Sequence, residues 1–165
     1  MGIFDLFFGW LRKPSEQKSD RVVTAKSGFV EALRHCSEEL SRLETVSKDE
    51  LSDSVHNIKR SDSGLQGASE SIITGVNSLS HSISQMKNLS AAAFAGTEER
   101  ASAVNLLKEL DVCRISLSRI IDSLKASAGE SDTSALQHYL FELQQKLSEP
   151  KTAVDALKKL VDSIG

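Results

Sequence analysis

The chain has 165 residues, of which 39% are hydrophobic and 26% are charged, and its formal net charge is −3. Such a composition predicts one compact domain, with or without an appendage. Acidic and basic residues are interspersed, which argues against the basic stripe that captures nucleic acid. The two cysteines, Cys36 and Cys113, are far apart in the sequence. They predict reduced thiols in a cytoplasmic protein more than a disulfide framework or a metal site.

The first segment, residues 1–11, contains the only Trp of the chain and three of its six Phe residues. On a helix its bulky apolar residues form one continuous arc, and the opposite side carries Gly2, Asp5, Gly9, Arg12 and Lys13. Aromatic side chains next to basic ones are typical of a helix that lies in a membrane interface. The predicted membrane-binding residues are Ile3, Phe4, Leu6, Phe7, Phe8, Trp10, Leu11, Arg12 and Lys13. Two other interpretations stay open: this helix docks on the protein's own bundle, or it binds a groove of a partner.

Pro14 is predicted to end this helix or to mark a hinge, because it lacks an N–H and disfavours helical geometry at the preceding residue. The polar residues 15–20 are predicted to form a short linker. Two regions follow from this: an amphipathic helix over residues 1–14, and a helical bundle or coiled coil over residues 15–165. Beyond Arg21 the apolar residues alternate steps of four and three, as in a coiled-coil seam. This first seam consists of Phe29, Leu33, Cys36, Leu40 and Leu43.

The Ser-x-x-Glu pattern of residues 47–50 predicts a capping box and the start of a new helix. A second seam follows, which is either the core of the bundle or an oligomerisation surface. Its members are Leu51, Val55, Ile58, Leu65, Ile72, Val76, Leu79, Ile83 and Met86. Because the seam keeps its register through residues 61–67, one prediction is a single helix of roughly 70 Å from Ser47 to Phe94. The other is a hairpin at Gly64–Gly67.

Three more helices are predicted in the remainder of the chain. Gly96 and Thr97 are predicted to end one helix and start the next. Gly129 is predicted to end that helix, residue 132 or 133 to begin another, and Pro150 to lie in the first turn of the last. The seams of these helices are Leu106, Leu110, Cys113, Leu117, Ile120 and Leu124; Leu136, Leu140, Leu143 and Leu147; and Val154, Leu157, Leu160, Val161 and Ile164. With no strand-like alternation in the sequence, the predicted fold class is all-α, with an N-terminal amphipathic helix and a bundle or coiled coil of long helices.

No arrangement of residues predicts catalysis. The four histidines are not spaced as ligands of helical zinc or di-iron sites. The sequence contains neither a glycine-rich phosphate loop nor a nucleophile elbow. We therefore expect a protein that is not an enzyme and has no catalytic residues, no metal and no cofactor.

The residues Met1-Gly2-Ile3-Phe4-Asp5 resemble the start of the PspA and Vipp1 proteins, bacterial relatives of the ESCRT-III membrane-remodelling family. Those proteins also open with a short amphipathic helix that precedes long helices, so the resemblance implies assembly on a membrane. It is confined to the N-terminal segment and the general pattern of long helices. The early Pro14 and the serine-rich, heptad-regular helices depart from that family.

Together these patterns predict a cytoplasmic, peripherally membrane-associated protein that prefers anionic lipid. It is expected to form a homo-oligomer or to recruit a helical protein partner, without binding nucleic acid. A single interfacial helix binds weakly and reversibly, and self-association would present several and strengthen attachment. The alternative is a soluble helical-bundle adaptor or chaperone-like module whose N-terminal helix docks on its own body or on a partner.

Overall fold

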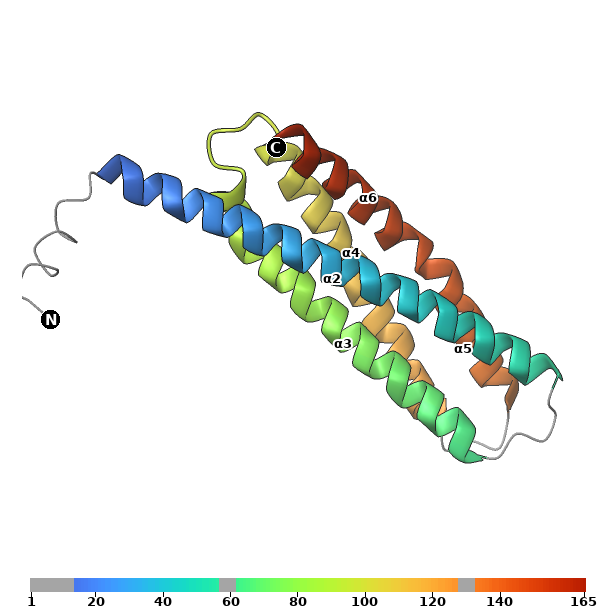
Figure 1. Ribbon diagram of the computed structural model, residues 1–165. Coiled ribbons are helices and arrows are strands. Elements are labelled where there is room, and N and C mark those ends of the chain that lie inside the picture. The colour runs from blue at the N-terminus through green and yellow to red at the C-terminus, as the bar shows by residue number, and fades with distance from the viewer. Residues whose placement is uncertain (1–13, 57–61, 128–132) are drawn as a thin grey trace, which may run out of the picture.

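The computed structural model describes residues 14–56, 62–127 and 133–165 (Figure 1). These residues form α2 (Pro14–His56), α3 (Asp62–Ala93), α4 (Arg100–Ser127), α5 (Thr133–Lys146) and α6 (Ser148–Ser163). The described ranges contain no strand, and the helices pack against one another, which confirms the all-α prediction.

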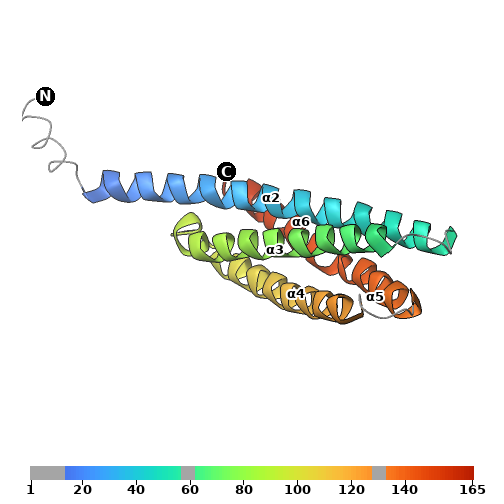
Figure 2. The same cartoon turned by 90° about the horizontal axis from the view of Figure 1, so that it is seen from below.

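The helices form a bundle of four antiparallel columns. α2, α3 and α4 are one column each, and α5 and α6 follow one another along the fourth (Figure 1). Around the bundle, α2 packs on α3, α3 on α4, and α4 on both α5 and α6, which return to α2 (Figure 2). Neighbours along the chain are therefore neighbours in space, as in an up-and-down bundle with short connections.

The core is built from the inward stripes that the seams predict. The five residues of the first seam are all buried, and Phe29 and Phe94 meet edge to face, with ring centroids 5.2 Å apart. In α4 the core position next to the predicted Leu106 belongs to Leu107, while Leu106 is half-buried. The largest fully buried side chains are Phe29, Leu43, Ile72, Leu79, Ile83, Met86, Phe94, Leu110, Leu117, Leu124, Leu143 and Leu157.

The prediction of one long helix from Ser47 to Phe94 is wrong. α2 ends at His56, and α3 begins at Asp62 and packs antiparallel on α2 (Figure 1). The chain therefore reverses direction between these residues, while Gly64 and Gly67, where the alternative hairpin was predicted, lie within α3. Reversal lets the two apolar stripes bury each other, whereas a single continuous helix would leave its stripe in water.

Two predicted breaks near the ends of α2 are also wrong. Residues 15–20 are helical, because α2 begins at Pro14, in the first turn, where proline's missing N–H costs no helical hydrogen bond. Ser47 does not begin a helix. It lies inside α2, fully buried, and its hydroxyl donates to the carbonyl oxygen of Glu44 at 3.0 Å. The local sequence does not distinguish a serine that donates to its own helix from a serine that caps the start of a helix.

The later boundaries agree better with the sequence. Gly96 has a left-handed φ of 75° just after α3, as predicted for a residue that follows a helix. α4 begins at Arg100, and the hydroxyl of Thr97 donates to the carbonyl of Phe94 at 3.0 Å, so Thr97 does not cap α4 as predicted. The predicted break before the last helix is confirmed: Pro150 lies in the first turn of α6.

Candidate functional site

The most distinctive feature of the bundle is that α2 extends beyond it. In both views the start of α2 runs past the ends of α3 and α4 (Figures 1 and 2). Ala25 is the first buried residue of α2, and residues 17–24 are exposed except for the half-buried Val22. We call residues 14–24 of α2 the stalk. At 1.5 Å per residue it is about 16 Å long.

The stalk is polar and does not pack against other helices as a core element does. Among residues 17–24, whose side chains the structure describes, Val23 is the one large apolar side chain that is exposed, at 65%. An isolated helix of this length is marginal in water, so the stalk owes its conformation to its continuity with the packed part of α2. The hydroxyl of Thr24 donates to the backbone carbonyl of Asp20 at 2.9 Å, within this helix. The stalk therefore separates Pro14 from the packed part of α2.

The predicted membrane-binding residues adjoin that outer end. Ile3, Phe4, Leu6, Phe7, Phe8, Trp10, Leu11, Arg12 and Lys13 lie outside the described residues. What the structure adds is their point of attachment, since residue 13 is joined to Pro14, the first residue of the stalk. The stalk itself was missed in the sequence, although Lys18 and Arg21 are good helix formers, because its polar composition was interpreted as a linker.

The second predicted seam divides into a described and an undescribed part. Ile72, Val76, Leu79, Ile83 and Met86 are at most 2% exposed and lie in the core of the single chain. The side chains of Leu51, Val55 and Leu65, and the whole of Ile58, lie outside the described residues. While the bundle is closed, the described part of this seam cannot pair with a second chain.

The described residues contain no group of three or more histidine, cysteine or acidic side chains that could hold a metal. His35 is half exposed, and its ring nitrogens lie 4.0 Å from Glu31 and 3.7 Å from Glu38, both on its own helix. Such exposed contacts neither orient a base nor exclude water.

The two cysteines are free thiols in surroundings that suppress the thiolate. Burial raises the pKa of Cys36 to about 12. Burial and the carboxylates of Glu149 and Glu109 raise the pKa of Cys113. A reactive cysteine needs the opposite shift, so neither thiol is prepared for nucleophilic chemistry.

Two surface hollows are lined by described residues. One, of about 450 Å³, lies at the start of α4 and is lined by Thr97, Glu98, Arg100, Ala101, Val104 and Asn105. The other, of about 220 Å³, lies between α4 and α5 and is lined by Ser116, Arg119, Ile120, Ser123, Glu142 and Lys146. Both are open to solvent and lack the apolar enclosure typical of small-molecule sites.

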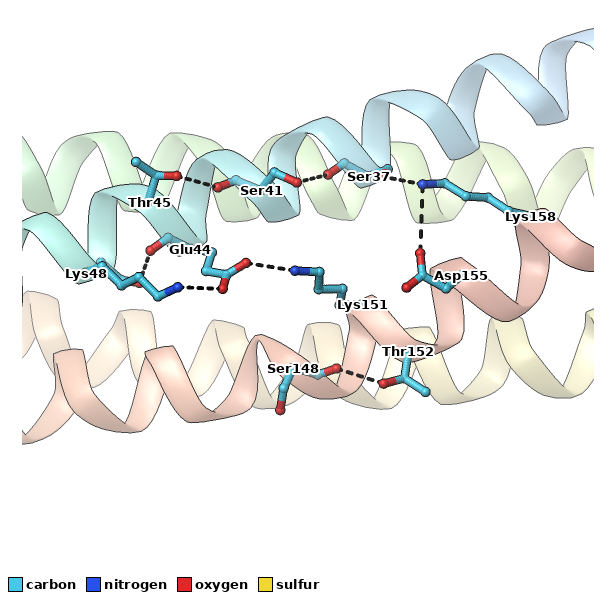
Figure 3. A network of polar contacts seen from close by, with 11 residues as sticks. Ser37, Ser41, Glu44, Thr45, Lys48, Ser148, Lys151, Thr152, Asp155 and Lys158 are labelled. Carbon is cyan, nitrogen blue, oxygen red and sulfur yellow. Dashed lines mark hydrogen bonds and ion pairs between the residues drawn. The ribbon is translucent and has the colours of Figure 1, made fainter.

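A polar network joins α2 to α6 on the outside of the core (Figure 3). The Glu44 carboxylate accepts from Lys151 of α6 at 3.1 Å and from Lys48 at 2.9 Å. Lys158 of α6 donates to the hydroxyl of Ser37 at 2.8 Å. Hydrogen bonds from Lys48 and then from Lys151 lower the pKa of the Glu44 carboxyl. The network fixes the position of α6 on α2, and we interpret it as structural.

No known protein-family model, curated protein or solved structure matches this chain. Within the described ranges, no helix is long and apolar enough to cross a membrane.

Proposed function

We propose that this protein is a non-enzymatic, peripheral membrane protein in which the N-terminal segment attaches a helical bundle to a lipid surface. One observation carries the proposal: the amphipathic sequence of residues 1–13 adjoins the outer end of a stalk that projects from the bundle. A stalk of about 16 Å leaves room for that segment to lie in an interface while the bundle stays in water. The resemblance of Met1–Asp5 to the PspA and Vipp1 proteins suggests the same use of the segment.

Self-association belongs to this proposal because one interfacial helix gives weak attachment and several give firm attachment. The described part of the second seam is buried inside the bundle, so self-association requires another surface. The outer face of α4 offers one, because it exposes Val104, Val112 and Ile115 at 37%, 63% and 41%.

The same face favours a second candidate function, a soluble adaptor that binds a helical partner through α4. Exposed apolar side chains that share one helix face are typical of protein-binding surfaces. In that case the N-terminal segment docks on the protein's own body or on its partner, and lipid has no role.

Fluorescence of Trp10, the only tryptophan, separates the two functions. The full-length protein is titrated with vesicles of phosphatidylcholine, with and without phosphatidylglycerol. The membrane function predicts solvent-like emission that shifts to shorter wavelength with the anionic vesicles. Emission that is already short in wavelength without lipid, and does not move when lipid is added, would favour the adaptor.

A pair of matched variants tests where the attachment lies. Phe7→Glu should release the protein from vesicles, because it removes a phenylalanine contribution of about 2 kcal/mol and adds a charge. Phe141→Glu makes the same change on the body, at a side chain that is 54% exposed, and should leave vesicle binding unchanged. Circular dichroism of both variants checks the fold. Equal loss of binding in the two variants would contradict attachment through the N-terminal segment.

A further inference from the structure

We infer that Lys18 and Arg21 of the stalk form a second contact with the membrane, to the headgroups of anionic lipids. This inference rests on the proposed function, since it requires the N-terminal segment to bring the stalk to a lipid surface. It assigns a role to two described residues that the sequence analysis placed in or beside a linker.

The two side chains share one side of the stalk. Both are exposed, and they are three residues apart, so they lie next to each other on the helix surface. Asp20, the acidic residue between them, is two residues from Lys18 and therefore points to the other side of the helix. The stalk thus presents two adjacent positive charges on one side.

Several basic residues on the bundle have an acidic partner, as in Arg34 with Glu38, Lys87 with Asp111 and Lys151 with Glu44. Lys18 and Arg21 have no such partner among the described residues. The stalk also contains Glu16 and Asp20, so its formal charge sums to zero. Neither Lys18 nor Arg21 is held in an ion pair within the described residues, however, so an anionic lipid surface can attract both side chains.

Their position along the stalk puts them within range of a charged surface. Lys18 is four residues and Arg21 seven residues beyond Pro14, or about 6 and about 10 Å along the helix axis. The Debye length at physiological ionic strength is ~8 Å, so Lys18 lies within one Debye length of a surface at Pro14 and Arg21 slightly beyond it. A tilt of the stalk toward the surface brings both charges within this range. Lys26, the next basic residue, donates to the carbonyl of Ile164 at 3.0 Å. Lys26 is therefore part of the packed bundle and not of the stalk.

A basic residue near an anionic surface strengthens binding about five-fold. The double variant Lys18→Gln/Arg21→Gln should therefore bind vesicles containing phosphatidylglycerol about 25-fold more weakly than the natural protein. It should also show a weaker dependence of binding on salt. At saturating lipid its Trp10 emission should reach the wavelength of the natural protein, because the N-terminal segment is intact.

The matched control is Lys125→Gln/Lys159→Gln. These two lysines, one in α4 and one in α6, are exposed and lie away from the face of α4 that carries Val104, Val112 and Ile115. Within the described ranges they also lack an acidic partner, so the net charge changes equally. The control should bind as the natural protein does. Equal weakening in both double variants would overturn the inference, since net charge alone would then explain the effect.

Other outcomes separate this inference from the proposed function. If Phe7→Glu abolishes binding and Lys18→Gln/Arg21→Gln binds as tightly as the natural protein, the stalk contact is overturned and the proposed function stands. If the natural protein does not bind either kind of vesicle, the proposed function fails, and the stalk contact fails with it.

Discussion

Gly75 of α3 lies where that helix passes close to α2. A Cβ atom added there would lie 2.6 Å from Nη2 of Arg42 and 2.7 Å from Cδ2 of Leu43. The arginine end can move, but Leu43 is fully buried and has little room. Gly75→Ala should therefore lower the free energy of unfolding by about 1–2 kcal/mol, because overpacking outweighs the gain of ~1 kcal/mol in helix propensity. Urea unfolding followed by circular dichroism measures the change.

Gly28 of α2 provides the comparison for Gly75. A Cβ atom there would meet only Cδ1 of Leu89, at 3.0 Å, the far end of a side chain that is partly buried. Gly28→Ala should lower the free energy of unfolding by less than about 0.5 kcal/mol, or should raise it. A loss at Gly28 equal to that at Gly75 would contradict the close approach described for Gly75.

The two thiols should differ sharply in reactivity. Cys36 is fully buried, and its pKa of about 12 keeps it protonated at mildly alkaline pH, whereas Cys113 is half-buried. In the folded protein a thiol reagent should modify Cys113 alone, and Cys36 only after unfolding. The variant Cys113→Ala should lose the early reaction, and Cys36→Ala should keep it. Early modification of Cys36 would show that the core opens on the time scale of the assay.

The shift at Cys36 also has a consequence for stability. Its pKa rises from 9.0 in the unfolded chain to about 12 in the fold. Between these values the folded protein holds the proton that the unfolded chain has released. The contribution of this group to stability is therefore complete below pH 9.0 and is lost as the pH rises toward 12.

At the scale of the elements, the contact between α2 and α6 depends partly on charge. Lys48 and Lys151 lower the pKa of Glu44, so the unfolded chain takes up a proton at this group before the folded protein does. The stabilisation is present above the unfolded pKa and is lost as the pH falls through the folded pKa. Glu44→Gln should cost at most about 1 kcal/mol near neutral pH, because the carboxylate is at the surface, and should reduce the loss of stability in acid.

Chemical unfolding of Glu44→Gln at neutral and acidic pH measures both effects. Glu31→Gln is the control, because Glu31 is exposed and its ion-pair contact is with His35 on the same helix. Acid sensitivity that is unchanged in Glu44→Gln would assign the acid response of the bundle to other carboxylates.

Heptad spacing predicted the burial of the seams in α2, α3 and α5 well, because one-sided burial is a local consequence of helix geometry. In α6 only Val154 and Leu157 of the predicted seam are fully buried. Chain direction was not predictable in the same way. A seam that keeps its register through a reversal looks like one uninterrupted helix, as between His56 and Asp62. The prediction that Ser47 begins a helix was wrong for a related reason. A serine hydroxyl can cap the start of a helix, or it can donate to a carbonyl in the preceding turn of the same helix, as Ser47 does.

The candidate site was predictable only in part. The apolar arc of the first residues is visible in the sequence, and its membrane role stays a prediction. The stalk could not be predicted, because nothing in the sequence of residues 15–24 shows whether another helix packs beside them. That depends on where α3 ends, at Ala93, and on the turn at Gly96. Relative helix lengths, not local patterns, determine which part of a helix projects.

For the molecule as a whole, the stalk defines an orientation. A lipid surface that holds the N-terminal segment would keep the bundle about 16 Å away along α2, or closer if the stalk tilts toward Lys18 and Arg21. α5 reaches α2 near the opposite end of the bundle (Figure 2). Phe141 of α5, which is 54% exposed, should therefore stay in water when the protein is bound.

Quenching by brominated lipids tests this orientation, because bromine quenches tryptophan only at short range. The natural protein reports on Trp10, and the variant Trp10→Phe/Phe141→Trp reports on the bundle. With anionic vesicles, Trp10 should be quenched strongly and a tryptophan at position 141 not at all, while co-sedimentation confirms that both proteins are bound. Similar quenching at both positions would mean that the bundle lies flat on the lipid. The stalk would then not act as a spacer, and the exposed apolar side chains of α4 and α5 would become candidates for the membrane-binding surface.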